Sequence, residues 1–295
     1  MEKQHNNYRL FFLLFGVIAV STGAIFAKFA SEVPAITLSA YRLSIPTLIF
    51  LPFAWFTLKK EIINLDVRTC IMGILSGAAL AGHFTAWITS LDYTSIARSL
   101  VFVNTTPLWI VIFAPFITGE RITRPMLIGI AVSMVGIALM GFKGDIHGSD
   151  VFKGDALALA GGACLAMYLM LGNRIRKKLS LFPYVSLCYG AGSVILWLIV
   201  LLAGLPCWGF SFGNTMAILG IAIIPQVLGH TIYNWSLKWF STGIVSVTLF
   251  IEPVMGALYG HFLFHESLSL YDVTGGILIL VGVFFVSKYS GSTKP

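Results

Sequence analysis

Two charged residues lie deep inside apolar stretches of the sequence, where they could carry chemistry. Glu252 lies about ten residues into the stretch 242–264, and Arg42 lies about eight residues beyond Pro34. At about 1.5 Å per helical residue, these depths are about 15 Å and about 12 Å. A charge so deep in a lipid bilayer is costly and usually faces a partner or a water-filled cavity. Both side chains are therefore candidates for a functional site.

Each of these two residues has more than one interpretation. Glu252 can bind a substrate or carry a coupled proton, or it can cap a helix that is broken at Pro253 or pair with a base. Arg42 can hold a substrate carboxylate through two parallel hydrogen bonds. It can instead pair with Glu252 or cap backbone carbonyl groups.

Polar and aromatic residues at helical spacing form a second group of candidates. Trp87 follows His83 by four residues, and Tyr233 and Asn234 follow His230 in a similar way, so each set shares one helix face. We expect His83 in the outer half of the membrane and His230 in the inner half. Histidine titrates near neutral pH and can relay protons. The alternatives are interhelical hydrogen bonding and ordinary aromatic packing.

Further polar residues lie within or near the ends of apolar stretches. Asn104 is at mid-depth in the stretch 95–117, whereas Lys28 and Arg98 are nearer the outer ends of theirs, where long side chains can reach the headgroups. The predicted substrate or proton pathway consists of Glu252, Arg42, His83, Trp87, Asn104, His230, Tyr233 and Asn234.

The composition excludes several classes of protein. Apolar residues make up 57% of the 295 residues and charged residues 11%, against roughly 25% charged residues in a typical soluble domain. So few charges cannot solvate the surface of a soluble enzyme or keep a chain disordered. The basic residues stand in short clusters between apolar runs, which is typical of membrane-protein loops and not of a nucleic-acid-binding surface.

The apolar runs predict an all-α integral membrane protein. A spanning helix needs roughly 20 mostly apolar residues, and the runs lack the alternation that is typical of a membrane β-barrel. The ten predicted spans are 10–30, 34–58, 67–90, 95–117, 124–142, 154–173, 181–204, 213–237, 242–264 and 270–288.

The positions of Lys and Arg predict the orientation. With the N-terminus inside, only Lys143 and Lys153 lie in an outer loop. Basic residues accumulate in cytoplasmic loops, so we predict that both termini are cytoplasmic and that the membrane is a bacterial inner membrane. The basic residues on the cytoplasmic side are Lys3, Arg9, Lys59, Lys60, Arg68, Arg121, Arg124, Arg174, Arg176, Lys177, Lys178, Lys238, Lys288 and Lys294.

The second half of the chain repeats the first at an offset of 146 positions. Each half holds five spans, and because five is odd the second half must insert upside down, as in many secondary transporters. We therefore predict two inverted five-helix repeats, 1–143 and 144–295, with helix kinks at Pro107 and Pro253. The aligned pairs are Pro107 with Pro253, Glu120 with Glu266, Gly129 with Gly275, and Gly136 with Gly282.

Short motifs occur in a fixed order along the two halves. The first half contains Lys28, Glu32-Val33-Pro34, Arg42, the run TSIARSLVFVNTTPLW and the Gly119-Glu120-Arg121 turn; the second contains STGIVSVTLFIEPVMG and the His265-Glu266 turn. In these motifs the chain resembles the drug/metabolite transporter superfamily, specifically proteins with two EamA-type domains. The resemblance covers almost the whole chain. It implies a secondary transporter, an exporter or exchanger of a small metabolite such as an amino acid or derivative, with alternating access around a midplane site.

Other activities have less support in the sequence. No phosphate-binding GxxxxGK[ST] motif, metal motif or catalytic triad order occurs, so we expect no cofactor, no metal and no enzyme activity. The expected partners are a small-molecule substrate, membrane lipid and, if transport is coupled, protons, with no nucleic acid and no signal for an oligomeric state. The alternatives are a flippase-like carrier of lipids or lipid-linked compounds and, after it, an intramembrane enzyme.

Overall fold

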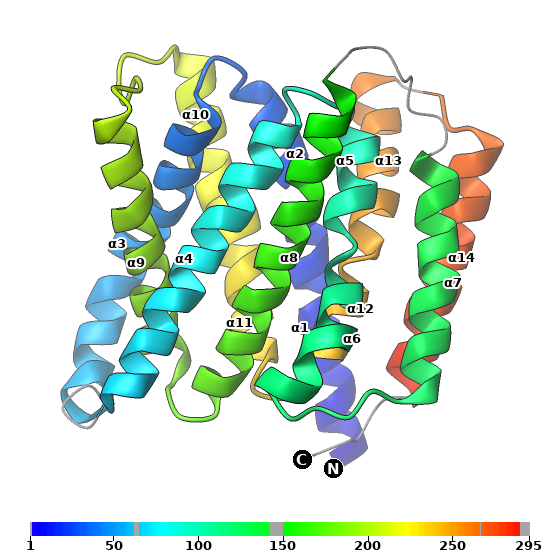
Figure 1. The fold of residues 1–295 in the computed structure, drawn as a ribbon, viewed down its shortest axis with the longest axis horizontal. Coiled ribbons are helices and arrows are strands. Elements are labelled where there is room, and N and C mark those ends of the chain that lie inside the picture. Colours follow the sequence, from blue (N-terminus) through cyan, green and yellow to red (C-terminus); the bar gives the residue numbers. More distant parts are fainter. Residues whose placement is uncertain (1, 62–64, 142–149, 266, 290–295) are drawn as a thin grey trace.

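The computed structural model describes residues 2–61, 65–141, 150–265 and 267–289, and these are mostly helical (Figure 1). Lys143, Glu266 and Lys294, named above, lie outside the described residues. The helices are α1 (Glu2–Ser21), α2 (Gly23–Phe29), α3 (Ala35–Glu61), α4 (Val67–Ser90), α5 (Ile96–Val103), α6 (Thr106–Ile117), α7 (Arg124–Gly141), α8 (Val151–Arg176), α9 (Leu181–Leu202), α10 (Phe212–Ile221), the π-helix η1 (Ala222–His230), α11 (Thr231–Ser236), α12 (Thr242–Thr248), α13 (Ile251–Phe264) and α14 (Leu270–Tyr289).

Ten helical segments within the described residues are long and apolar enough to cross a membrane, which confirms the predicted number. Their ends agree with the predicted ends to within about one helical turn. Lys153, predicted in a loop, lies instead in the first turn of α8. Numbered 1 to 10 in chain order, the spans are Asn7–Phe29, Ala35–Phe56, Val67–Ser90, Arg98–Ile117, Arg124–Gly141, Val151–Arg176, Leu181–Leu202, Phe212–Ser236, Thr242–Leu263 and Leu270–Tyr289.

The two five-span halves have opposite orientations. Span 4 consists of α5 followed by α6, and span 9 of α12 followed by α13. Figure 1 shows α5 above α6 but α12 below α13. The repeat-related residues Ser95 and Ser241 cap the first helix of each pair, because their hydroxyls accept from the backbone N–H groups of Arg98 and Ile244. The structure thus contains the inverted repeats predicted from the sequence.

The two faces of the bundle can be named from the chain ends. The helix α1 begins, and α14 ends, at the lower face in Figure 1. We call this the terminal face and the other the opposite face. An even number of spans brings both ends of a chain to the same side, in agreement with the ten spans.

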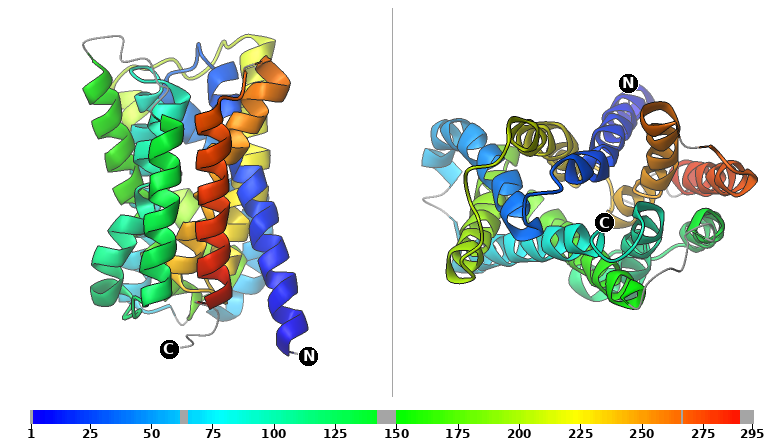
Figure 2. Two further views of the ribbon diagram at one scale, coloured as in Figure 1. Left: turned by 90° about the vertical axis from the view of Figure 1, so that its right-hand side faces the viewer. Right: turned by 90° about the horizontal axis from the view of Figure 1, so that it is seen from above.

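Small residues hold α7 against α14 at one edge of the bundle (Figures 1 and 2). A Cβ atom at Gly136 would lie 2.5 Å from the carbonyl oxygen of Gly275, and one at Gly275 would lie 2.5 Å from that of Gly136. Neither position has room for a side chain. Close approach of backbones at small residues is a common way to join helices in membranes.

A methyl group added to this contact should destabilise the protein. In Gly282→Ala the Cβ atom would overlap Ser133 Oγ and lie 2.5 Å from the Gly129 carbonyl oxygen. Overpacking of this kind typically costs about 1–3 kcal/mol, so we expect a lower midpoint of thermal unfolding in detergent. Gly276→Ala on the same helix is the control, because its Cβ atom would lie 3.7 Å from Val254. Equal midpoints for the two variants would contradict the prediction.

Candidate functional site

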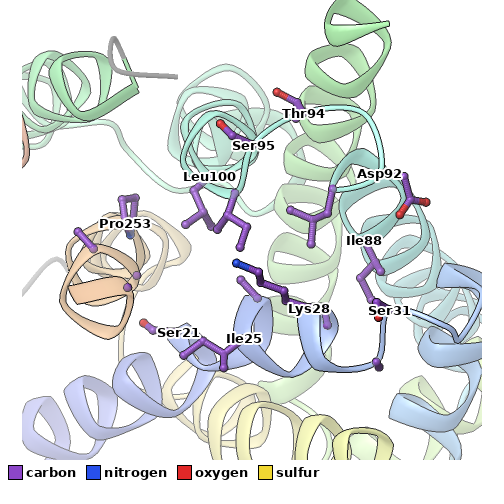
Figure 3. Close-up of a pocket in the computed structure, with 18 of the residues that line it drawn as sticks. Ser21, Ile25, Lys28, Ser31, Ile88, Asp92, Thr94, Ser95, Leu100 and Pro253 are labelled. Carbon is purple, nitrogen blue, oxygen red and sulfur yellow. The ribbon is translucent and has the colours of Figure 1, made fainter. Parts of the chain in front are cut away.

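A cavity of about 1090 Å³ opens at the opposite face of the bundle. Its rim is formed by the loops that join spans 1 and 2, spans 3 and 4, and spans 9 and 10, including Glu32, Asp92 and Leu268. Its walls come from both repeats, with Leu100 of α5 facing Pro253 of α13 (Figure 3). The cavity therefore lies between the two halves of the chain.

Four charged residues line this large cavity: Lys28, Glu32, Asp92 and Asp272. Figure 3 shows the Lys28 side chain extending from α2 into the cavity, whereas we expected it to reach the headgroups. The expectation was wrong because α2 turns this face toward the other half of the bundle. Asp92 lies in the loop after span 3, where partial burial raises the pKa of its carboxyl group.

A second, much smaller cavity lies next to the first and shares Ser21, Ala24 and Leu100 with it. Its volume is about 20 Å³, which is enough for about one water molecule. Six of the eight residues of the predicted pathway line it. They are Arg42, His83, Trp87, Asn104, His230 and Glu252.

Interruptions of helices gather around the small cavity. Span 1 is interrupted at Thr22, span 4 at Asn104 and Thr105, and span 9 at Leu249 and Phe250. In span 8, η1 replaces regular α-helix, and π-helical segments often mark functional sites. Discontinuous helices free backbone groups at mid-membrane and form the binding sites of many transporters.

The two prolines predicted to kink their helices each follow one of these interruptions. Pro107 is the second residue of α6 and Pro253 is the third residue of α13. A proline is tolerated in the first turn of a helix because no N–H group is needed there. The chain therefore breaks just before each proline, and Asn104 lies at the first of the two breaks.

Arg42 is almost fully buried, with 1% of its surface exposed. Its Nε donates to Gln226 Oε1 at 3.1 Å, and the guanidinium lies over the Phe84 ring, 3.8 Å from its centroid. Its Nη1 atom has no hydrogen-bond partner. Within the described part of the chain no carboxylate forms an ion pair with it, so the predicted alternative of a direct pair with Glu252 is not present.

Glu252 lies in the first turn of α13 and lines the same cavity as Arg42. The Tyr233 hydroxyl faces the carboxylate but makes no hydrogen bond of normal geometry. Thr106, the residue that precedes Pro107, is its counterpart in the first repeat, so this part of the site carries a carboxylate in one half only.

The two predicted histidines lie side by side. Their ring centroids are 6.3 Å apart, and Nδ1 of His83 lies 2.9 Å from the Gly161 carbonyl oxygen. Their contact joins span 3 of the first half to span 8 of the second at the small cavity. With a one-residue gap in the offset of 146, His83 and His230 correspond in the two repeats.

The remaining predicted residues are divided between two places. Trp87 stacks on His83 with the ring centroids 6.1 Å apart and the planes 4° apart. Asn234 lies outside the cavity, because its amide donates to Tyr189 and accepts from Tyr168. The Tyr233 ring contacts the His230 ring, so Tyr233 lies between the small cavity and the hydrogen bonds of Asn234.

Arg98 is held inside the protein, contrary to the expectation that it would reach the headgroups. Its guanidinium donates to both carboxylate oxygens of Asp155 on α8, with the shortest distance 2.6 Å. Only 19% of the Arg98 side chain and 8% of the Asp155 side chain are exposed. Asp155 was not among the predicted site residues, although it is an acidic residue within a span.

Hydrogen bonds join several spans on the terminal side of the small cavity. Glu120 accepts from the backbone N–H and the hydroxyl of Thr242, which ties the loop after span 4 to the start of span 9. Arg176 at the end of α8 is buried and donates to the carbonyl oxygens of Asn234 and Leu179. These contacts lie on the side away from the mouth of the large cavity.

A family model described as the EamA-like transporter family matches residues 8–142 and, a second time, residues 152–288. The chain belongs to the EamA-like transporter family. The resemblance to a protein with two EamA-type domains is confirmed, and this EamA protein is a membrane transporter.

Other transporters are similar to this EamA protein. It is 24% identical to an uncharacterized transporter of Archaeoglobus fulgidus, over 72% of this chain and 73% of that one. It is also 24% identical to the uncharacterized transporter YyaM of Bacillus subtilis, over 84% and 83% of the chains. The uncharacterized inner membrane transporter YedA of Escherichia coli is 23% identical, over 78% and 75%.

A solved crystal structure has the same fold. It superposes with a TM-score of 0.79 and covers 97% of this chain and 99% of its own. The sequence identity is 17%, so the match supports the arrangement of the ten spans and no more.

Proposed function

We propose that this EamA transporter is a secondary carrier of a small metabolite such as an amino acid or a derivative, which it exports or exchanges by alternating access. One observation carries the proposal. A large cavity open at the opposite face adjoins a small cavity lined by Arg42 and Glu252, and hydrogen bonds join spans 4 and 9 on the terminal side of it. This is the arrangement expected of one of the two states of an alternating-access carrier.

Protons are the proposed coupling ion, and Glu252 is the proposed proton carrier. The carboxylate lines the small cavity together with Arg42 and the two histidines, which contact each other. A group in this position changes its exposure when the halves exchange conformations. Binding of a proton and binding of a substrate at adjoining groups are then linked.

Transport into proteoliposomes tests the proposal. We expect at least one member of a panel of the protein L-amino acids and their N-acetyl derivatives to be taken up above protein-free vesicles. We expect an imposed pH gradient to change the extent of accumulation. A panel without any uptake, when the same vesicles translocate fluorescent phospholipids, would favour the lipid carrier instead.

Reporter fusions test the orientation, which we propose is terminal face inward in a bacterial inner membrane. Fusions after Arg121, after Lys178 and at the C-terminus should report cytoplasm, because basic residues accumulate on that side. A fusion after Asp150 should report the periplasm. A periplasmic signal at Arg121 or Lys178 would reverse the assignment of the faces.

A further inference from the structure

Several buried nitrogen atoms at or beside the small cavity lack a hydrogen-bond partner among the described residues. Arg42 Nη1 and Trp87 Nε1 belong to residues that line it, and Gln226 Nε2 belongs to the residue that accepts from Arg42. The exposed fractions of these residues are 1%, 6% and 0%. Buried polar groups are almost always satisfied in folded proteins, so several orphan donors in one place call for an explanation.

The geometry around Arg42 leaves one arm of its guanidinium available. Gln226 accepts from Nε, and the Phe84 ring covers one face of the group at 3.8 Å. Trp87 lies on the same side of the cavity, 5.9 Å from ring centroid to guanidinium. Gln226 and Phe84 fix the guanidinium, while Nη1 remains without an acceptor.

We propose that Arg42 and Trp87 bind one oxygen atom of an anionic group, a carboxylate or a phosphate, in the water-sized small cavity, with Gln226 positioning the guanidinium and the rest of the ligand extending into the adjoining large cavity. Such a group only accepts hydrogen bonds, and the orphan atoms nearby can supply donors. His230 Nδ1, which lines the same cavity and also lacks a partner, can donate in one of its two tautomers. That the ligand is the transported substrate rests on the proposed function. The inference then limits the substrate to compounds that carry a carboxylate or a phosphate.

Gly23 is the residue that sets the space beside this anion-binding group. It begins α2, directly after the interruption of span 1. A Cβ atom here would lie 3.6 Å from Arg42 Nη1 and 3.4 Å from Cη2 of Trp87. These are ordinary van der Waals contacts, so alanine fits without displacing its neighbours. It would nevertheless narrow the space next to Nη1, although Gly23 itself lines neither cavity.

Direct binding tests the chemical class of the ligand. Purified protein in nanodiscs of zwitterionic lipid is titrated with acetate, benzoate and inorganic phosphate, and with acetamide and benzamide as uncharged matches. The readout is the part of the tryptophan fluorescence change that Trp87→Phe removes. We expect saturable binding of the acids and at least tenfold weaker binding of the amides, because a charge-assisted hydrogen bond is lost. Preference for phosphate over both carboxylates would identify the anion as phosphate.

Substitutions then locate the binding. Arg42→Lys keeps the positive charge but loses the planar guanidinium and its parallel N–H donors. We therefore expect about tenfold weaker binding of the carboxylates. Lys28→Gln removes a cation from the outer part of the cavity and should change binding by less than about threefold, since it is not in the anion-binding group.

Gly23→Ala is the variant that retains the fold. We expect it to weaken benzoate binding more than acetate binding, because the added methyl group takes up room beside Nη1 that the larger ligand needs. Gly190→Ala is the matched control, because its Cβ atom would lie 3.5 Å from Thr47 and away from both cavities. It should bind both acids as the unmodified protein does.

The outcomes separate this inference from the proposed function. Equal binding of acids and amides, unchanged binding by Arg42→Lys, or no binding of any acid by a protein that transports would overturn the anion site and leave transport standing. Binding of acids with the predicted mutational pattern, by a protein that transports nothing, would overturn the transport proposal and leave the anion site standing.

Discussion

Glu252→Gln should abolish the accumulation of substrate driven by a pH gradient, while exchange of substrate between two compartments continues. Glutamine keeps the size of the side chain and much of its hydrogen bonding but cannot titrate. A gradient of one pH unit corresponds to about 1.4 kcal/mol and can support up to about tenfold accumulation per proton. We expect this accumulation to fall to the level seen without a gradient. Flux measurements in proteoliposomes provide both readouts.

Glu120→Gln is the control for this prediction. Glu120 is also a carboxylate, but it caps the start of span 9 at the terminal face and does not line either cavity. Protein of this variant that reaches the vesicles should respond to the gradient. A Glu252→Gln variant that still concentrates substrate would remove the coupling role, and poor folding with normal coupling would make Glu252 structural.

Arg98→Ala should cause a large loss of stability. It leaves the Asp155 carboxylate within a span without its partner, and only 8% of that side chain is exposed. Removal of one member of a buried ion pair typically costs about 3–5 kcal/mol. We expect a midpoint of thermal unfolding several degrees lower and a smaller yield of folded protein.

The double variant Arg98→Ala/Asp155→Ala tests the cause. It removes both charges, so we expect it to recover a large part of the lost stability, as a double-mutant cycle would show. Lys178→Ala is the matched control at the surface, since Lys178 and Asp66 form a pair of 2.9 Å with about half of each side chain exposed. Its midpoint should hardly change. A double variant as unstable as the single one would mean that Arg98 acts through its packing.

The spans and the repeat could be predicted from sequence because both depend on properties that extend over many residues. Hydrophobic length defines a span, and the odd number of spans per half dictates inversion. Glu252, Arg42, His83 and His230 could be singled out for the same physical reason, since a polar side chain at mid-membrane is expensive. The structure brings all four to one cavity.

The partners of these residues could not be predicted, because they depend on how distant spans pack. Nothing in the local sequence says that Arg98 meets Asp155, or that Asn234 turns toward Tyr168 and Tyr189. Gln226 was missed although a signal existed. It is a polar residue directly after Pro225 inside an apolar run, in a segment whose hydrogen bonding the structure shows to be π-helical.

The carboxylate in only one half of the chain has a consequence for the kinetics. Thr106, the counterpart of Glu252, uses its hydroxyl to bind the carbonyl oxygens of Val103 and Gly162, so the two halves do not offer a ligand the same groups. Alternating access exchanges the conformations of the two halves. Because the halves are unlike, the two resulting states of the carrier differ in energy and in affinity for the ligand. At equilibrium the ratio of maximal rate to half-saturating concentration must be equal for the two directions of transport. The maximal rate and the half-saturating concentration can each differ between the two directions. We expect both to be unequal when transport is assayed from the two sides of the membrane.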